Sequence, residues 1–121
     1  MRIEVRYQST QILRDYNAHV NSDRPGSPMS RVLLAPMEGL ADDLLRGVLT
    51  AIGGYDWAIC EFIRVSGSVL PVRTYQRICP ELLSDSRTAA GTPMRVQLLG
   101  SDPYFMAENA RRLATLNPAG I

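Results

Sequence analysis

The stretch Arg31-Val-Leu-Leu-Ala-Pro-Met-Glu-Gly39 decides the fold of this chain. Residues 32–35 are all apolar, and an apolar run without polar alternation predicts a short strand covered on both faces, as in a parallel sheet. Pro36 has no N–H to donate to a neighbouring strand, so we expect the strand to end there. Residues 37–39 then follow the carboxyl end of a strand, which is where α/β folds bind their ligands.

Two more apolar segments farther along the chain predict further strands. They are Trp57-Ala-Ile-Cys-Glu-Phe-Ile-Arg-Val65, with a strand over residues 57–62, and Met94-Arg-Val-Gln-Leu-Leu-Gly100, with a strand over residues 94–99. One or two polar residues interrupt each segment. In a strand that is buried on both faces, an isolated Glu or Gln needs a hydrogen-bond partner or a ligand.

Helix signals alternate with these strands. Asp42 or Asp43 can cap a helix that ends at Gly53-Gly54, and its apolar residues are expected to share one face, namely Leu44, Leu45, Val48, Leu49 and Ile52. Asp102-Pro103 opens a second helix, with Asp as the N-cap and Pro at the first helical position. The mostly apolar face of that helix consists of Phe105, Met106, Asn109, Ala110, Leu113 and Leu116.

The remaining segments complete a β-α-β-loop-β-α order. Residues 66–92 are long and irregular, with a short helix or hairpin expected near residues 75–82, and a loop of this length is usually functional. Residues 117–121 are expected to begin a further strand. This alternation predicts parallel strands with the helices on the outer side of the sheet.

Together with Arg77-Ile-Cys-Pro-Glu-Leu82, the three strand segments resemble the tRNA-dihydrouridine synthases, which are FMN-dependent reductases of RNA uridine. The combination resembles the bacterial subclass that acts on uridine 16 in the tRNA D-loop, and it covers residues 31–121. The resemblance implies an α/β fold, the TIM-type (β/α)8 barrel, which usually takes ~250 residues. We therefore expect an N-terminal fragment, in which residues 31–121 form the first three β/α units and stop before the fourth strand.

The resemblance also implies cofactor-binding roles for four residues. Pro36, Met37 and Glu38 match the family's segment under the FMN ring, where backbone groups and a flat apolar side chain can line the ring. Gln97 matches a glutamine that hydrogen-bonds the flavin, since an amide can both donate and accept. Plainer interpretations exist for two of them: Met37 can fill the core, and the Gln97 side chain can reach a neighbouring backbone group.

Arg64 is the residue that the resemblance assigns to tRNA, because an arginine at this position is typical of the uridine-16 subclass. An exposed loop arginine is the plainer interpretation.

In the implied reaction NADPH reduces the FMN, which then reduces a flipped-out uridine while a cysteine protonates carbon 5. That cysteine is expected beyond residue 121, so no catalytic residue is assigned within this chain. Glu61 is a minor candidate for orienting polar groups in the pocket.

Composition sets broad bounds on the protein. A chain of 121 residues with 45% hydrophobic content can form a globular core, and a net charge of +1 says little about partners. Cys60 and Cys79 have neither metal-ligand nor disulfide-framework spacing, and no stretch approaches the length of a membrane span. We expect a cytoplasmic protein without a metal, monomeric as the complete enzyme. Residues 1–30 are expected to be a polar, disordered extension in which His19 is solvated.

Two alternatives to the synthase stay open at this point. One is another FMN-dependent barrel oxidoreductase, such as a dihydroorotate dehydrogenase, which would share the flavin turn but not the segment at residues 77–82. The other is a non-catalytic, truncated remnant with an RNA-binding or structural role. All 13 basic residues are arginine, which suits phosphate contacts, although genomic base composition can equally produce such a bias.

Overall fold

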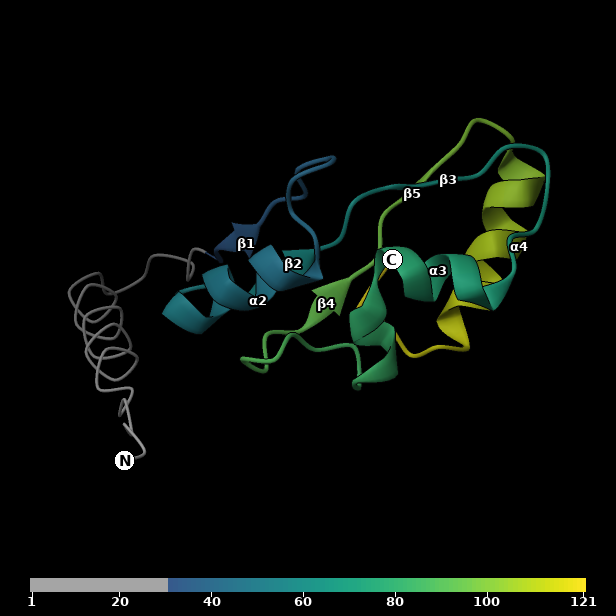
Figure 1. Ribbon diagram of the computed structural model, residues 1–121. Helices are drawn as coiled ribbons and strands as arrows, with labels where there is room; N and C mark the ends of the chain where they lie inside the picture. Colours follow the sequence, from purple (N-terminus) through teal and green to yellow (C-terminus); the bar gives the residue numbers. More distant parts are fainter. Residues whose placement is uncertain (1–30) are drawn as a thin grey trace, which may run out of the picture.

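The computed structural model describes residues 31–121, and the predicted extension at residues 1–30, with His19, lies outside the described residues (Figure 1). In chain order the elements are β1 (Leu33–Leu34), α2 (Asp43–Ile52), β2 (Trp57–Ile59), β3 (Ile63–Arg64), α3 (Val72–Ile78), the 3-10 helix η1 (Pro80–Leu83), β4 (Met94–Arg95), β5 (Leu98–Leu99) and α4 (Pro103–Ala114).

The strands are parallel, as the alternation of strands and helices predicted. One sheet has the order β1-β2-β4, and β3 pairs with β5 in a second, two-stranded sheet. In the first sheet Leu34 is opposite Ala58, and Ala58 is opposite Met94. Every strand runs in the same direction as its neighbour, so the carboxyl ends gather at one edge.

A bulge divides the second and third predicted strands into two pieces each. Ile59 is opposite Arg95, whereas Ile63 is opposite Leu98, so three residues (60–62) face two residues (96–97). Pairing continues on both sides, since the Cys60 N–H donates to the Arg95 carbonyl (3.0 Å) and the Ile63 N–H donates to the Gln97 carbonyl (2.8 Å). One extra residue on one strand is the definition of a β-bulge, a feature that re-aims side chains next to binding sites.

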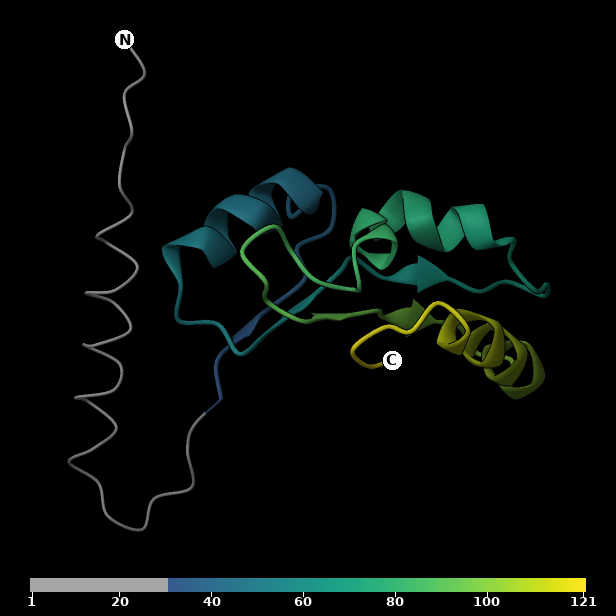
Figure 2. The same ribbon diagram turned by 90° about the horizontal axis from the view of Figure 1, so that it is seen from below.

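The core lies on one face of the sheet. Alternate residues in and just after the strands are buried there, namely Leu34, Ala58, Cys60, Met94 and Val96. They belong to one cluster with Tyr75 of α3, Leu82 of η1, Leu113 of α4 and Cys79, which lies between α3 and η1. Figure 2 shows α2 and α3 on the same side of the strands. The expectation that the first strand is covered on both faces is wrong for residues 31–121, because Leu33 on the other face is 41% exposed and the three helices contribute to a single cluster.

The face away from the helices carries a small aromatic and cationic cluster near the start of the strands. The guanidinium groups of Arg31 and Arg95 lie 4.6 Å and 4.3 Å from the centroid of the Trp57 ring. Each distance is within the range of a cation–π interaction. The cluster joins the residues before β1 to β2 and β4.

Helix α2 begins and ends where the sequence predicted, but the side of the helix that is buried carries polar residues. The Asp42 carboxylate accepts a hydrogen bond from the Leu45 N–H (2.8 Å), and the helix ends at Gly53 with a φ of 96°. Of the five apolar residues expected on one face, Leu49 packs against the core, whereas Leu44, Val48 and Ile52 are exposed. The fully buried side of the helix carries Arg46 and Thr50 instead. The physical reason is the acidic partner that Arg46 finds inside the fold, described below.

Helix α4 and the residues after it follow the prediction. Asp102 accepts hydrogen bonds from the N–H groups of Tyr104 and Phe105, and Leu113 and Asn109 of the predicted face are buried. Beyond α4, the Ala119 N–H donates to the Met94 carbonyl (2.9 Å), and the Gly120 carbonyl accepts from the Val96 N–H (2.9 Å). These bonds place the end of the chain beside β4 in the parallel direction, as expected for the beginning of a further strand.

Candidate functional site

The parallel register brings the predicted site residues to one edge of the sheet. Because Leu34, Ala58 and Met94 are aligned, Pro36 lies just past β1 at the level of the bulge, and Gln97 lies opposite the bulge on the neighbouring strand. Arg64 is paired with Leu99 farther toward the carboxyl end. All three therefore lie toward the end of a parallel sheet at which ligands bind.

The segment after β1 is a tight turn. The Met37 carbonyl accepts hydrogen bonds from the N–H groups of Leu40 (3.0 Å) and Ala41 (2.8 Å). Gly39 has a φ of 71°, a conformation that favours glycine. The Met37 side chain is 36% exposed and Glu38 is exposed. Met37 is thus not a core residue of the described region, and the turn leaves both side chains accessible.

Two side chains hold this turn at different backbone groups. The Glu61 carboxylate accepts a hydrogen bond from the Gly39 N–H at 2.6 Å. The Arg46 guanidinium donates to the Ala41 carbonyl, also at 2.6 Å. Glu61 belongs to the bulge and Arg46 to α2, so the turn is fixed to the sheet and to the helix that follows it.

Gln97 presents an exposed amide at this edge. Its side chain is exposed and forms no hydrogen bond with residues 31–121, so the interpretation of a strand glutamine bonded to nearby backbone has no support there. An open groove of about 460 Å³ lies beside it, lined by Val96, Gln97, Leu98, Met106, Ala107, Ala110 and Ile121. The groove is mostly apolar, with the Gln97 amide as a polar group.

Arg64 lines a second open groove, of about 400 Å³, at the carboxyl ends of β3 and β5. Its guanidinium lies 5.4 Å from the centroid of the Phe62 ring, and the side chain is exposed. The floor of the groove is close-packed at Gly100, where a Cβ atom would meet the Val65 carbonyl oxygen at 2.7 Å. A planar cation in such a groove can contact a phosphate or stack on a base.

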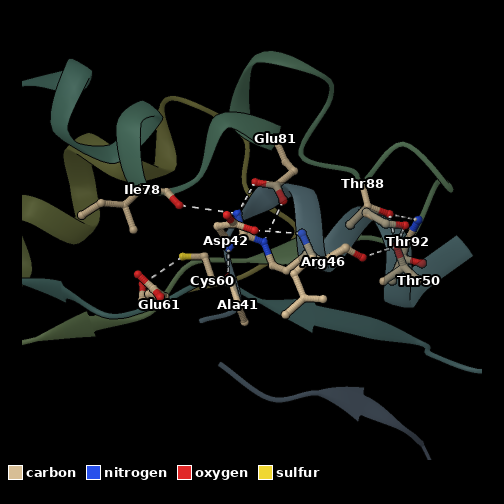
Figure 3. Close-up of polar contacts among 12 residues, drawn as sticks. Ala41, Asp42, Arg46, Thr50, Cys60, Glu61, Ile78, Glu81, Thr88 and Thr92 are labelled. Carbon is tan, nitrogen blue, oxygen red and sulfur yellow. Dashed lines mark hydrogen bonds and ion pairs between the residues drawn. The ribbon is translucent and has the colours of Figure 1, made fainter. Parts of the chain in front are cut away.

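Sequence reasoning missed the buried ion pair behind the turn (Figure 3). The Arg46 Nε and Nη2 atoms donate to the two carboxylate oxygens of Glu81, each at 2.8 Å. Burial works to lower the pKa of Arg46, but the hydrogen bond and the charge of Glu81 raise it above its ordinary value, so Arg46 stays protonated. One signal was available: Arg46 and Thr50 are four residues apart and form a polar stripe on α2.

The two cysteines are core residues. Cys60 and Cys79 are fully buried and are not joined in a disulfide. The hydrogen bond with the Cys60 thiol and burial raise the pKa of the Cys79 thiol, which therefore stays protonated.

Among residues 31–121 no cluster of His, Cys, Asp and Glu could hold a metal ion. Within the same residues no helix has the length and apolar character needed to cross a membrane.

This geometry defines a class: an α/β domain that presents a fixed turn, an exposed amide and an arginine at the carboxyl end of a parallel sheet. Residues 33–121, which are well over half of the chain, match the dihydrouridine synthase family. The chain belongs to the dihydrouridine synthase family.

Several curated relatives are similar over about three quarters of the chain. The tRNA-dihydrouridine(16) synthase of Ralstonia nicotianae is 59% identical over 93 residues, which cover 77% of this chain and 28% of the relative. The protein of the same name from Cupriavidus necator is 60% identical over 93 residues (77% and 29%). That of Salmonella typhimurium is 54% identical over 91 residues (75% and 29%). The chain thus spans between a quarter and a third of the length of these relatives.

Proposed function

We propose that the full-length protein containing residues 31–121 is an FMN-dependent tRNA-dihydrouridine synthase. It reduces a uridine of the tRNA D-loop, at position 16, to 5,6-dihydrouridine, with NADPH as the reductant. The observation that carries this proposal is the 59–60% identity to relatives named tRNA-dihydrouridine(16) synthase over 93 residues. Every predicted site residue lies within residues 33–121, which match the family. We propose that the full-length protein acts as a monomer in the cytoplasm.

The proposed fold is a TIM-type barrel in which residues 31–121 supply the first three β/α units. Three features support it: the parallel register, the helices on one face of the sheet, and residues 119–120 beside β4. The uncovered face, with Leu33 and Trp57, would then point to the barrel interior, which side chains fill in such folds. The family match begins at residue 33, which supports a domain boundary close to residue 31.

The residues at the sheet edge fit FMN. When bound, FMN supplies the hydride chemistry for reducing the uracil ring. Pro36, Met37 and Glu38 would line the isoalloxazine through the turn backbone and the accessible Met37 side chain. The Gln97 amide, free within the described residues, would donate to and accept from the pyrimidine edge of the ring. Arg64 would bind tRNA in its groove and orient the target uridine.

The alternatives differ from this proposal in what they predict. Membership in the dihydrouridine synthase family argues against a dihydroorotate dehydrogenase. A non-catalytic remnant would give no dihydrouridine in any context. The test is complementation: a bacterial strain lacking its own uridine-16 enzyme receives the full-length gene, and dihydrouridine is mapped in its tRNA. Dihydrouridine at position 16 is the expected result, its appearance elsewhere in the D-loop would overturn the position, and its absence would overturn the proposal.

Replacing Gln97 is expected to weaken FMN retention. Gln97→Ala would leave a buried polar edge of the flavin without a partner, which costs about 1–3 kcal/mol. Flavin absorbance relative to protein absorbance in the purified full-length variant measures the effect. Gln76→Ala is the matched control, because Gln76 is an amide on α3. Full flavin content in Gln97→Ala would show that the side chain has no cofactor role.

Replacing Arg64 is expected to separate RNA binding from flavin chemistry. Arg64→Ala would remove a contact to phosphate or base while leaving the flavin turn intact. The full-length variant is expected to keep FMN and to oxidise NADPH, yet to form less dihydrouridine at position 16 in the complementation assay. Arg111→Ala, at an exposed arginine on α4, serves as the control. Equal modification by Arg64→Ala and the unmodified protein would remove Arg64 from the RNA interface.

A further inference from the structure

We propose that Glu61 is a positioning residue that sets the backbone of the turn at residues 36–41 for cofactor binding. The inference rests on the proposed function, since it takes that turn to be the FMN-binding segment. Glu61 itself would not touch the cofactor through its hydrogen-bonded oxygen. It would act through the N–H of Gly39.

The contact is short and charge-assisted. The Gly39 N–H donates to Glu61 Oε1 at 2.6 Å, across 22 residues of sequence. Hydrogen bonds to a carboxylate are roughly twice as strong as neutral ones. Among residues 31–121, Glu61 provides the only side-chain hydrogen bond to the backbone of residues 37–39. The other hydrogen bonds of this stretch run within the turn, from Leu40 and Ala41 to the Met37 carbonyl.

The bulge explains why Glu61 can reach the turn. Cys60 and Ile63 are both buried core residues, although three positions separate them. Strict alternation would bury residues at even spacing, so the extra residue in the bulge keeps both Glu61 and Phe62 off the core face. Glu61 is half-buried and lies at the level of the residues that follow β1. A bulge at this point therefore gives the second strand a side chain aimed at the end of the first.

The turn needs such a restraint at Gly39. At Ala41 the turn is fixed by Arg46, which is itself held by Glu81 in the core. At Gly39, which has a φ of 71°, no heavy atom of residues 31–121 other than its own and those of its two chain neighbours lies within 4 Å of the position that a Cβ atom would take, so this side of the residue is open. The Glu61 carboxylate thus restrains the exposed end of the turn, next to Met37. Without it, the lining of the proposed cofactor site would lose its fixed position.

The chain contains a matched control for this contact. Asp56 Oδ2 accepts a hydrogen bond from the Val32 N–H at 2.7 Å. This contact has the same chemistry and joins the same two segments, but at the amino end of the strands. If Glu61 merely fastened β1 to β2, then Asp56→Ala would have the same effect on FMN as Glu61→Ala.

The experiment is a titration of FMN into the apo form of the full-length protein. Binding is measured by the quenching of flavin fluorescence. Loss of the hydrogen bond in Glu61→Ala is expected to raise the Kd for FMN about tenfold, whereas Glu61→Gln, which keeps an acceptor oxygen, stays within about threefold. Asp56→Ala is expected to bind FMN like the unmodified protein.

Three results would overturn the inference. They are an unchanged Kd in Glu61→Ala, an equal loss in Asp56→Ala, or binding by Glu61→Gln as weak as that of Glu61→Ala. If Glu61→Ala does not fold, Glu61→Met, which keeps the length of the side chain without an acceptor oxygen, takes its place in each of these comparisons. Absence of FMN binding by the unmodified protein would overturn the proposed function and this inference with it, whereas binding with any of the three results would overturn the inference alone.

Discussion

Glu81→Ala is expected to lower the free energy of unfolding by about 3–5 kcal/mol. The substitution leaves the Arg46 guanidinium, which is fully buried, without the carboxylate that now receives two of its hydrogen bonds. A buried charge without a partner is among the most costly single defects in a protein. The measurement is urea denaturation of the full-length protein, with the midpoints of both proteins compared at equal slope.

The control for this prediction removes both charges together. Arg46→Met combined with Glu81→Leu replaces the pair by apolar side chains of similar size, a change that is often nearly neutral. We expect the double variant to be more stable than Glu81→Ala alone. A loss below about 1 kcal/mol in Glu81→Ala, the range of a solvent-exposed pair, would show that water reaches Arg46 in solution.

Asn109→Ala is expected to have the second-largest effect, a loss of about 2–4 kcal/mol. Asn109 is fully buried and uses its whole amide. Its Oδ1 accepts from the Leu70 N–H (2.9 Å) and from the Tyr75 hydroxyl (2.6 Å), and its Nδ2 donates to the carbonyls of Ser68 (2.9 Å) and Phe105 (2.7 Å). The side chain thus ties α4 to α3 and to the loop before α3, and its loss leaves several of these groups without partners.

Two measurements separate this network from simple packing. Tyr75→Phe removes one hydroxyl and is expected to cost only about 1 kcal/mol. Hydrogen exchange of the Leu70 amide is expected to accelerate in Asn109→Ala, because that N–H loses its acceptor. Equal losses in Asn109→Ala and Tyr75→Phe would show that the Tyr75 hydroxyl carries most of the network.

Local signals in the sequence predicted the outline of the fold. Pro36 marks the end of β1, Asp42 and Asp102 cap their helices, and Gly53 ends α2, because each acts through backbone geometry or a hydrogen bond within a few residues. The side of α2 that packs against the core was not predictable from such local signals. Its orientation depends on the Arg46–Glu81 pair, whose partners are 35 residues apart, and periodicity counts apolar residues without seeing such a partner.

In the site, too, some features follow from local sequence signals and others depend on contacts between distant residues. The parallel register brings Pro36, Gln97 and Arg64 toward one edge, as the order of elements predicted, while their roles toward FMN and tRNA stay predictions. Glu61 was rated a minor candidate because its significance depends on the bulge. A bulge arises from the register between two strands, and neither segment reveals that register by itself.

The cluster around Trp57 has an optical consequence. Trp57 is the only tryptophan of the chain, and its indole contacts Arg31, which precedes β1, and Arg95 in β4. These contacts exist only while the starts of three neighbouring strands are assembled. The turn at residues 36–41 follows the opposite end of β1. The emission of the Trp57 indole therefore reports on sheet assembly from a position apart from the turn, so unfolding and ligand binding can be followed as two separate signals.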